Sequence, residues 1–313
     1  MARYILGRLA GLAFVMLVVS FITFFMMYSA PGGPWNEMNQ PLSDNARANM
    51  KHKYGLDQPF YVNWWQWLGK AVRGDFGESY VVPNTKVLDL YLRFWGSSLM
   101  LGGLAVLWSF PVGILFGVVA ALKRNTIVDQ VLTTLSLMTV TLPQISLIFI
   151  GITVFVIELK WFGFTSGRPL YEQPVQAWIL PVFLFGVGPV GQITRYTRSG
   201  MLDVLGQDYI RTAKAKGVSR TSVILKHAMR NMLVPLVTVF GPTLANAITG
   251  STYIEVAFAI PGIGKYFLSS IFSRDYPLII FTVILTATIL TVSNLVIDLT
   301  YTLIDPRVRV ASR

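Results

Sequence analysis

Six stretches of the chain contain no Asp, Glu, Lys or Arg over 22 residues or more, whereas the next longest such stretch, 58–69, has only 12 residues. A helix needs about 20 mainly apolar residues to cross the hydrocarbon core of a bilayer. The pattern therefore predicts an all-α polytopic membrane protein with six transmembrane helices. The predicted helices fall within 9–36, 94–122, 130–157, 173–194, 231–254 and 276–297.

The first stretch has an alternative interpretation as a secretory signal peptide, because Arg3 and Arg8 precede it. The apolar part of a signal peptide usually has about 7–15 residues, and this one is longer. The small residues Ser29 and Ala30 are followed directly by Pro31, which is a poor context for cleavage. We therefore expect the stretch to be retained as the first membrane helix.

Lys and Arg are distributed unequally between the two sides of the predicted membrane protein. With six helices, both termini lie on one side together with 123–129 and 195–230, and that side carries 15 Lys and Arg against 5 Asp and Glu. The other side carries 11 against 10. The positive-inside rule therefore places both termini in the cytoplasm. The formal net charge of +11 follows from this topology, so we expect the lipid bilayer and no nucleic acid as a partner.

Composition excludes several kinds of site. Charged residues make up 13% of the chain, about half the fraction of a soluble domain. There is no cysteine, which excludes disulfides, zinc–thiolate sites and iron–sulfur clusters. The two histidines, His52 and His227, are far apart in the sequence. We expect no metal site, no catalytic residues and no cofactor bound by this chain.

The segment 29–95 is predicted to form a small extracytoplasmic insertion between the first two membrane helices. Its sequence predicts a short polar helix over 44–53 and an aromatic amphipathic helix over 61–72. Trp64, Trp65 and Trp67 on the second helix suit anchoring at the membrane interface, with stacking on a partner or a substrate as alternatives. A segment this small is marginally stable alone, so we expect it to lean on the membrane helices or on another chain.

The inner loop that begins at residue 195 carries signals for two short helices. Asp208 is predicted to cap a helix over 209–216, Gly217 to follow its end, and Ser219 to cap a second helix that runs toward Pro235. Ala213 and Ala215 would let another surface approach closely. The spacing favours equally a helix that enters a groove on a partner and a basic loop that only sets topology.

The sequence of this loop resembles the cytoplasmic loop of permeases of ATP-binding-cassette (ABC) importers. The general pattern of that family is E-A-A, three residues and Gly, and the oligopeptide and dipeptide branch reads R-T-A-x-A-K-G. In this chain the same positions read Arg211-Thr212-Ala213-Lys214-Ala215-Lys216-Gly217.

Further motifs of that branch occur in order along nearly the whole chain. The chain departs from the pattern in two places. Gly33 replaces an Asp in A-P-G-D-P, and the segment 94–98 lacks the family's L-P-N-T. The matching segments are Ala30-Pro31-Gly32, Tyr54-Gly55-Leu56-Asp57, Gly74-Asp75-Phe76-Gly77, Pro261-Gly262-Ile263-Gly264, Arg274-Asp275-Tyr276-Pro277 and Asp305-Pro306-Arg307. Together they resemble the first permease subunit of the peptide and nickel group.

The resemblance implies a type I ABC importer fold in the cell membrane of a prokaryote. It divides the chain into 1–28 with the first helix, the insertion 29–95, and the permease core 96–313 with a cytoplasmic coupling loop over 195–234. The implied partners are a second homologous permease, two ATPases that bind ATP and Mg, and an extracytoplasmic solute-binding protein. The residues implied to contact an ATPase are Asp208, Tyr209, Arg211, Thr212, Ala213, Lys214, Lys216 and Gly217.

Polar residues within or near the predicted membrane helices are the candidates for the translocation path. Each is more often a hydrogen-bond partner between helices than a ligand contact. Glu255 is a carboxylate near a helix end, and it can meet a peptide amine or pair with Lys265 or Arg274. The candidates are Gln144, Gln192, Asn246, Thr249 and Glu255.

Motifs of other functional classes are absent from the sequence. Residues 259–266 fail the phosphate-loop pattern G-x-x-x-x-G-K-[ST], so the chain is not expected to be an enzyme that hydrolyses ATP. A secondary transporter driven by an ion gradient often has ionisable residues at mid-membrane, and the six stretches contain none. Within the importer family, the substrate class stays open between di- or oligopeptides, nickel complexes, glutathione and oligosaccharides.

Overall fold

The computed structural model describes residues 2–30, 43–53, 55–165 and 167–304. These residues form helices and connecting turns without a strand, and Glu78 and Lys86 form an isolated bridge. The segment around Pro31, the motif residue Tyr54 and the motif Asp305-Pro306-Arg307 lie outside the described residues.

Among the described residues, four helices are long and apolar enough to cross a membrane. A bent pair adds a fifth span if its two halves are counted as one, so the number six is not confirmed on this criterion. The remaining predicted stretch, 231–254, lies mainly in α10, Met229–Thr249. The four helices are α1 (Ala2–Ser29), α4 (Val87–Leu122), α7 (Val175–Leu205) and α13 (Tyr276–Ile304).

The bent pair joins α5, Ile127–Thr141, to α6, Gln144–Gly151, and to the π-helix η1, Ile152–Glu158, at an angle of 105°. Pro143 causes the break. It precedes α6 as its N-cap residue, and Leu142 before it is extended, with φ −69° and ψ 132°. A residue before proline is disfavoured in the helical region, so the chain must leave α5 here.

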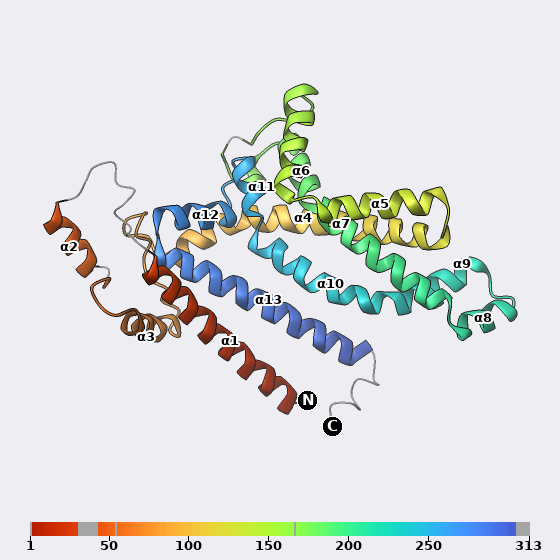
Figure 1. Ribbon diagram of the computed structural model, residues 1–313, viewed down its shortest axis with the longest axis horizontal. Helices are drawn as coiled ribbons and strands as arrows, with labels where there is room; N and C mark the ends of the chain where they lie inside the picture. Colours follow the sequence, from red (N-terminus) through yellow and green to blue (C-terminus); the bar gives the residue numbers. More distant parts are fainter. Residues whose placement is uncertain (1, 31–42, 54, 166, 305–313) are drawn as a thin grey trace.

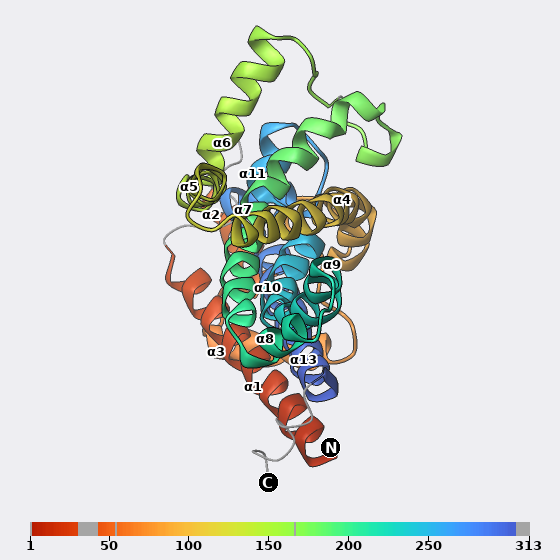
Figure 2. The same ribbon diagram turned by 90° about the vertical axis from the view of Figure 1, so that its right-hand side faces the viewer.

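The long helices pack around α4 and α7, which cross at the centre of the molecule (Figure 1). Helix α10 contacts α4, α7 and α13, and α1 packs against α13. The first turn of α1 and the last turn of α13 lie at the same end of the molecule in both views (Figures 1 and 2). The short helices α8, Asp208–Ala215, and α9, Arg220–Ser222, lie at the opposite end from α2, α3 and α12 (Figure 1).

Two glycines of α4 allow the backbone of α7 to come close. A Cβ atom at Gly113 would lie 2.8 Å from the side chain of Ile193, and one at Gly117 would lie 2.7 Å from the carbonyl oxygen of Thr194. Small residues at such contacts are the usual means of close helix packing in membranes. The contact between α4 and α7 therefore depends on glycine at both positions.

The outer segment leans on the first membrane helix. It contains α2, Asp44–Lys53, and α3, Phe60–Ala71, which confirms both predicted helices with a shift of one residue for the second. Trp64 donates a hydrogen bond from Nε1 to Ser20 Oγ of α1 at 3.0 Å. Trp65 is 67% exposed, so only part of the aromatic face packs against the protein.

A buried carboxylate ties the outer segment to the start of α13. Asp275 accepts hydrogen bonds from the hydroxyl of Ser79 and from the backbone N–H of Tyr80, the latter at 3.1 Å. Burial raises the pKa of the Asp275 carboxyl, and these hydrogen bonds oppose that shift. Because Ser79 is also buried, the link between the two segments is shielded from water.

Replacing Asp275 by alanine should loosen the outer segment. The Asp275→Ala change leaves a buried hydroxyl and a backbone N–H without their acceptor, which costs about 1–3 kcal/mol. Thermal unfolding of the detergent-purified protein should therefore begin at a lower temperature. Glu78→Ala is the matched control, since that carboxylate is exposed in the same segment. Equal unfolding curves for the two variants would contradict the assigned link.

Candidate functional site

The predicted short helix of the inner loop is α8, and one buried side chain anchors it. Ile210 is fully buried, whereas most of the other residues of α8 are exposed. Tyr209 adds a second anchor, since its hydroxyl accepts a hydrogen bond from Nδ2 of Asn231 in α10 at 2.7 Å. The helix is therefore held on one side and open on the other.

The prediction that Asp208 caps this helix is wrong. The N-cap residue is Gln207, and Asp208 is the first helical residue with no capping hydrogen bond from its side chain. Its carboxylate instead lies 3.6 Å from Nη1 of Arg211, and both side chains are strongly exposed. Such exposed pairs contribute little to stability.

The end of α8 follows the prediction for Gly217. This residue has φ 76°, the left-handed conformation that glycine adopts at little cost. Its N–H donates to the carbonyl of Lys214 at 3.0 Å, and the N–H of Val218 donates to the carbonyl of Ala213 at 3.2 Å. These two bonds form a Schellman motif, which satisfies carbonyls that the helix end leaves unpaired.

The second predicted helix also begins where expected. Ser219 accepts a hydrogen bond from the N–H of Ser222 and caps α9, which confirms its role. The chain continues through the π-helix η3, Val223–Ala228, directly into α10. Ala228 and Met232 pack in one buried cluster with Met201 of α7. The inner loop is therefore attached rigidly to both α7 and α10.

All eight predicted contact residues lie in α8 or in its C-terminal turn. Ala213 is half-buried, and Thr212 donates its hydroxyl hydrogen to the carbonyl of Asp208 at 3.0 Å. The exposed members present a basic surface, since no acidic residue other than Asp208 lies among them. The cations of this surface are Arg211, Lys214 and Lys216.

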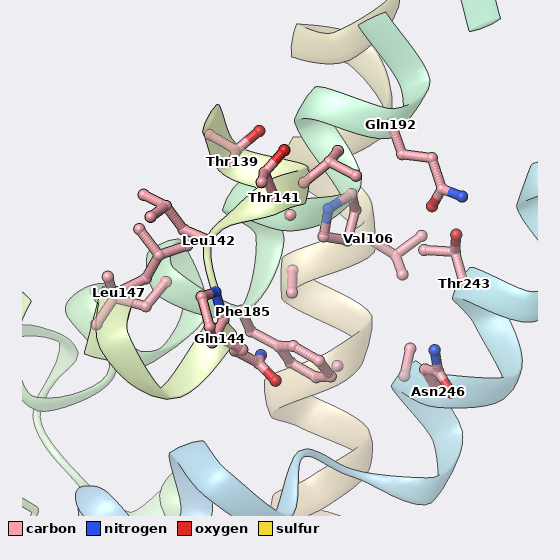
Figure 3. A pocket seen from close by; sticks show the side chains of 18 residues that line it. Val106, Thr139, Thr141, Leu142, Gln144, Leu147, Phe185, Gln192, Thr243 and Asn246 are labelled. Atoms are coloured by element: carbon pink, nitrogen blue, oxygen red, sulfur yellow. The ribbon is translucent and has the colours of Figure 1, made fainter. Parts of the chain in front are cut away.

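A cavity of ≈490 Å³ lies between α4, α5, α6, α7 and α10 (Figure 3). Three of the predicted path residues line it, namely Gln144, Gln192 and Asn246. Gln192 of α7 and Thr243 of α10 point toward one another across it (Figure 3). Within the described part of the chain, the side-chain amides of the three path residues make no hydrogen bond, so they are open to a ligand.

The other two path candidates do not line this cavity. Thr249 donates its hydroxyl hydrogen to the carbonyl of Ala245 at 3.0 Å. Glu255, in α11 (Thr252–Ala257), is fully buried and accepts from Ser98 Oγ at 2.7 Å and from the backbone N–H of Lys265 at 3.0 Å. Glu255 thus contacts the backbone amide of Lys265. This amide lies near the start of α12 (Ile263–Ser273), where the helix dipole favours a negative charge.

One charged pair was missed by the sequence analysis. Asp129 of α5 and Arg198 of α7 form a bidentate ion pair, with Nε to Oδ1 at 2.6 Å and Nη2 to Oδ2 at 2.8 Å. The two residues are 69 positions apart, and a single sequence carries no signal that joins them. The one available hint was that Asp129 borders a long stretch without charges.

Two family models match the chain. The model described as "Binding-protein-dependent transport system inner membrane component" covers residues 113–310. The model described as "Binding-prot-dependent transport system membrane comp, N-term" covers residues 1–83. Together the two matches include α8, the cavity helices α5, α6, α7 and α10, and most of the outer segment.

Three curated relatives illustrate the similarity over the full length. The dipeptide transport system permease protein DppB of Bacillus subtilis is 39% identical over 309 residues, covering 99% of this chain and 98% of that protein. The oligopeptide transport system permease protein OppB of Haemophilus influenzae is 34% identical, covering 99% and 100%. The glutathione transport system permease protein GsiC of Escherichia coli K12 is also 34% identical, covering 99% of each.

Among solved structures, a chain of the MetNI methionine ABC transporter in an inward-facing conformation has a similar fold. The TM-score is 0.51 at 17% sequence identity, and the match covers 67% of this chain and 96% of that chain. This similarity supports the type I importer fold that the sequence motifs predict.

Proposed function

Since this chain belongs to the family of binding-protein-dependent transport system inner membrane components, and is thus a membrane-embedded permease subunit of an ABC importer, we propose that it forms part of a translocation path for di- or oligopeptides. The observation that carries the proposal is the cavity lined by Gln144, Gln192 and Asn246. Amide side chains can both donate and accept hydrogen bonds, as a peptide backbone requires.

The substrate class rests on the relatives as well as on the cavity. Two of the relatives described above are named for dipeptide or oligopeptide transport, and one for glutathione, which is itself a small peptide. Nickel complexes and oligosaccharides are the other substrates of this group that the sequence left open. The cavity side chains are amides, hydroxyls and apolar groups, without a charged residue or a histidine among them, which favours a peptide over a metal complex.

The same family membership supports the partners. The ATPase of an ABC importer is a separate subunit, so ATP and Mg belong to two ATPase subunits and not to this chain. The family description names a binding-protein-dependent transport system, which supports a binding protein that delivers the ligand from outside. A second homologous permease would complete the path, because this chain alone does not enclose the cavity.

Helix α8 is proposed as the element that an ATPase moves. Its basic exposed face, with Arg211, Lys214 and Lys216, suits a groove on another subunit, and Ala213 permits close approach. The loop 195–234 would then transmit closure of the ATPases as a rigid-body displacement of α7 and α10. Those two helices carry Gln192 and Asn246 in the cavity wall.

The domain division 1–28, 29–95 and 96–313 and the six-span topology with both termini in the cytoplasm complete the proposal. The structure supports this orientation by its arrangement, since α8 and α9 lie at the end opposite to α2, α3 and α12 (Figure 1). The membrane is then the cytoplasmic membrane of a prokaryotic cell.

The orientation can be tested with single cysteines, because the natural chain contains none. Val81→Cys lies in the outer segment, 50% exposed, and avoids the left-handed backbone of Asn84. Thr221→Cys lies in the exposed α9. An impermeant thiol reagent on intact cells or spheroplasts should label position 81 and spare position 221 until the membrane is permeabilised. The reverse labelling pattern would refute the topology.

The transport function can be tested in vesicles that contain both permeases and both ATPases. Uptake of a labelled dipeptide or oligopeptide should require ATP on the side of the membrane where the ATPases lie. It should also require the binding protein on the opposite side. Asn246→Trp should reduce uptake about tenfold or more, because the indole ring fills part of the ≈490 Å³ cavity. Phe272→Trp is the control, since that side chain is 65% exposed and does not line the cavity. Uptake driven by an ion gradient without the binding protein would overturn the proposal.

The coupling of ATP hydrolysis to uptake can be tested with a pair of glycine variants in the inner loop. Gly217→Val forces a β-branched residue into the left-handed conformation at a cost of about 1–2 kcal/mol, which lowers the equilibrium constant for forming the turn about fivefold or more. We expect uptake per ATP hydrolysed to fall about fivefold or more. Ala213→Trp should act in the same direction by blocking close approach.

The matched control is Gly206→Val, because Gly206 has an ordinary φ of −79° and its Cβ position meets only normal contacts. Asp208→Ala should have a smaller effect than the Gly217 change, since the carboxylate caps no helix. Wild-type uptake per ATP hydrolysed in both Ala213→Trp and Gly217→Val would refute the role assigned to α8.

A further inference from the structure

The ion pair between Asp129 and Arg198 has the geometry of a rigid connector. Both guanidinium nitrogens Nε and Nη2 bind the carboxylate, and the side chain of Asp129 is only 5% exposed. The same carboxylate accepts the backbone N–H of Asn125 at 2.9 Å and the hydroxyl of Thr133 at 3.3 Å. The two bonds to Arg198 restrict how α5 can move relative to α7, and the local bonds from Asn125 and Thr133 hold the carboxylate in place.

The pair lies between the inner loop and the cavity. Arg198 is on α7 shortly before that helix ends at Leu205 and leads into α8. Asp129 is in the first turn of α5, and the far end of α5 supplies Thr139 and Thr141 to the cavity wall. The connection thus joins two walls of the cavity at the end nearest to α8.

Close backbone contacts extend this connection along α5 and α7. A Cβ atom at Gly191 of α7 would lie 2.7 Å from the carbonyl oxygen of Ser136 in α5. On its other side, α7 is pressed against Gly113 and Gly117 of α4. Helices at such short separations slide past one another only if these contacts break. The three helices therefore form one packed unit whose α5 edge is pinned by the ion pair.

Helix packing alone does not require charges at this place. Removing a charged pair from water is costly, and apolar residues of similar volume often hold helices together at least as well. A bidentate pair differs from an apolar contact in its directionality, because it fixes both the register and the rotation of the two helices.

We propose that Asp129 and Arg198 are positioning residues that make α5 follow α7 when α8 is displaced, so that both cavity walls move together. The inference rests on the proposed function of α8 and deepens it. Without the pair, displacement of α8 would still move α7, but the register and rotation of α5 against α7 would be less fixed, so the positions of Thr139 and Thr141 relative to Gln192 would vary. ATP would then be hydrolysed without an ordered change in the cavity.

A double-mutant cycle on uptake per ATP hydrolysed tests this role. The variants are Asp129→Asn, Arg198→Gln and the double variant, each in the complete transporter with permease partner, ATPases and binding protein. Each single variant leaves one charge unpaired, and we expect uptake per ATP to fall about tenfold or more. Because the two residues act as one connector, the double variant should be no worse than either single variant.

Arg195→Gln is the matched control, since it removes an exposed arginine one turn earlier on the same helix. A double variant whose loss equals the product of the single losses would overturn the proposal, as would wild-type coupling in the single variants. Should the single variants fail to assemble, the double variant decides: assembly with reduced uptake per ATP hydrolysed supports the connector, and assembly with wild-type coupling, or no assembly, overturns it.

A distance measurement separates positioning from general stability. Spin labels at cysteines replacing Ile127, which is 77% exposed, and the exposed Asp203 report on the inner ends of α5 and α7. The wild-type background should give the same narrow distance with and without trapped ATP, and Asp129→Asn should give a broader distribution that changes with ATP. A distance that stays narrow in the variant would overturn the proposal.

Failure of this inference differs from failure of the proposed function. If the wild-type complex shows no uptake that depends on ATP and the binding protein, the transport function itself is wrong. If wild-type uptake requires both ATP and the binding protein, and the Asp129 and Arg198 variants stay coupled, only the role of this ion pair is refuted.

Discussion

The close contact between α4 and α7 is the constraint on which the rest of the molecule depends. Glycine at positions 113 and 117 lets the two backbones approach to a distance at which a larger residue would collide with Ile193 or with the Thr194 carbonyl. A membrane offers little hydrophobic driving force between helices, so dense packing of this kind has to supply much of the association. Helices α5 and α10 then assemble against the pair, and the cavity is the space that these helices leave between them.

Polar groups inside this helical assembly follow one physical rule. Among the described residues, nearly every buried polar side-chain atom is paired, with Trp67 Nε1 and Thr197 Oγ1 as exceptions, because an unpaired polar group away from water is costly. Glu255 is held by Ser98 and by the amide of Lys265, and Asp129 is held by Arg198. The amides of Gln144, Gln192 and Asn246 differ, since they face an open cavity and stay available. The contrast separates side chains that hold the helices from side chains that can meet a ligand.

In the proposed function an ATPase acts on the inner loop, and the structure attaches this loop firmly to the membrane helices. Its helix α8 is short and exposed, yet Ile210 is fully buried and Tyr209 is bound by Asn231 of α10. The Schellman turn at Gly217 and the cap at Ser219 continue the chain into α10 without a flexible linker. A force on α8 therefore reaches α7 and α10 directly, and the charged pair at Asp129 offers a route to α5.

Local signals determined much of this protein from sequence alone. The stretches without charges marked the long helices, and the residue types at Gly217 and Ser219 marked the ends of the short ones, because both depend only on neighbours in the chain. The prediction that Asp208 caps α8 was wrong, also for a local reason. Gln207 already has the extended backbone of an N-cap residue, and Asp208 lies inside the helix.

Tertiary structure alone decided which distant residues meet. It joined Asp129 to Arg198 across 69 positions, gave Glu255 the hydroxyl of Ser98 as a partner, and kept Thr249 and Glu255 out of the cavity that Gln144, Gln192 and Asn246 share. It also placed the 105° break that Pro143 introduces where it opens one wall of that cavity. A helix can be read from periodicity and caps, but its rotation and its neighbours depend on how all the helices pack at once.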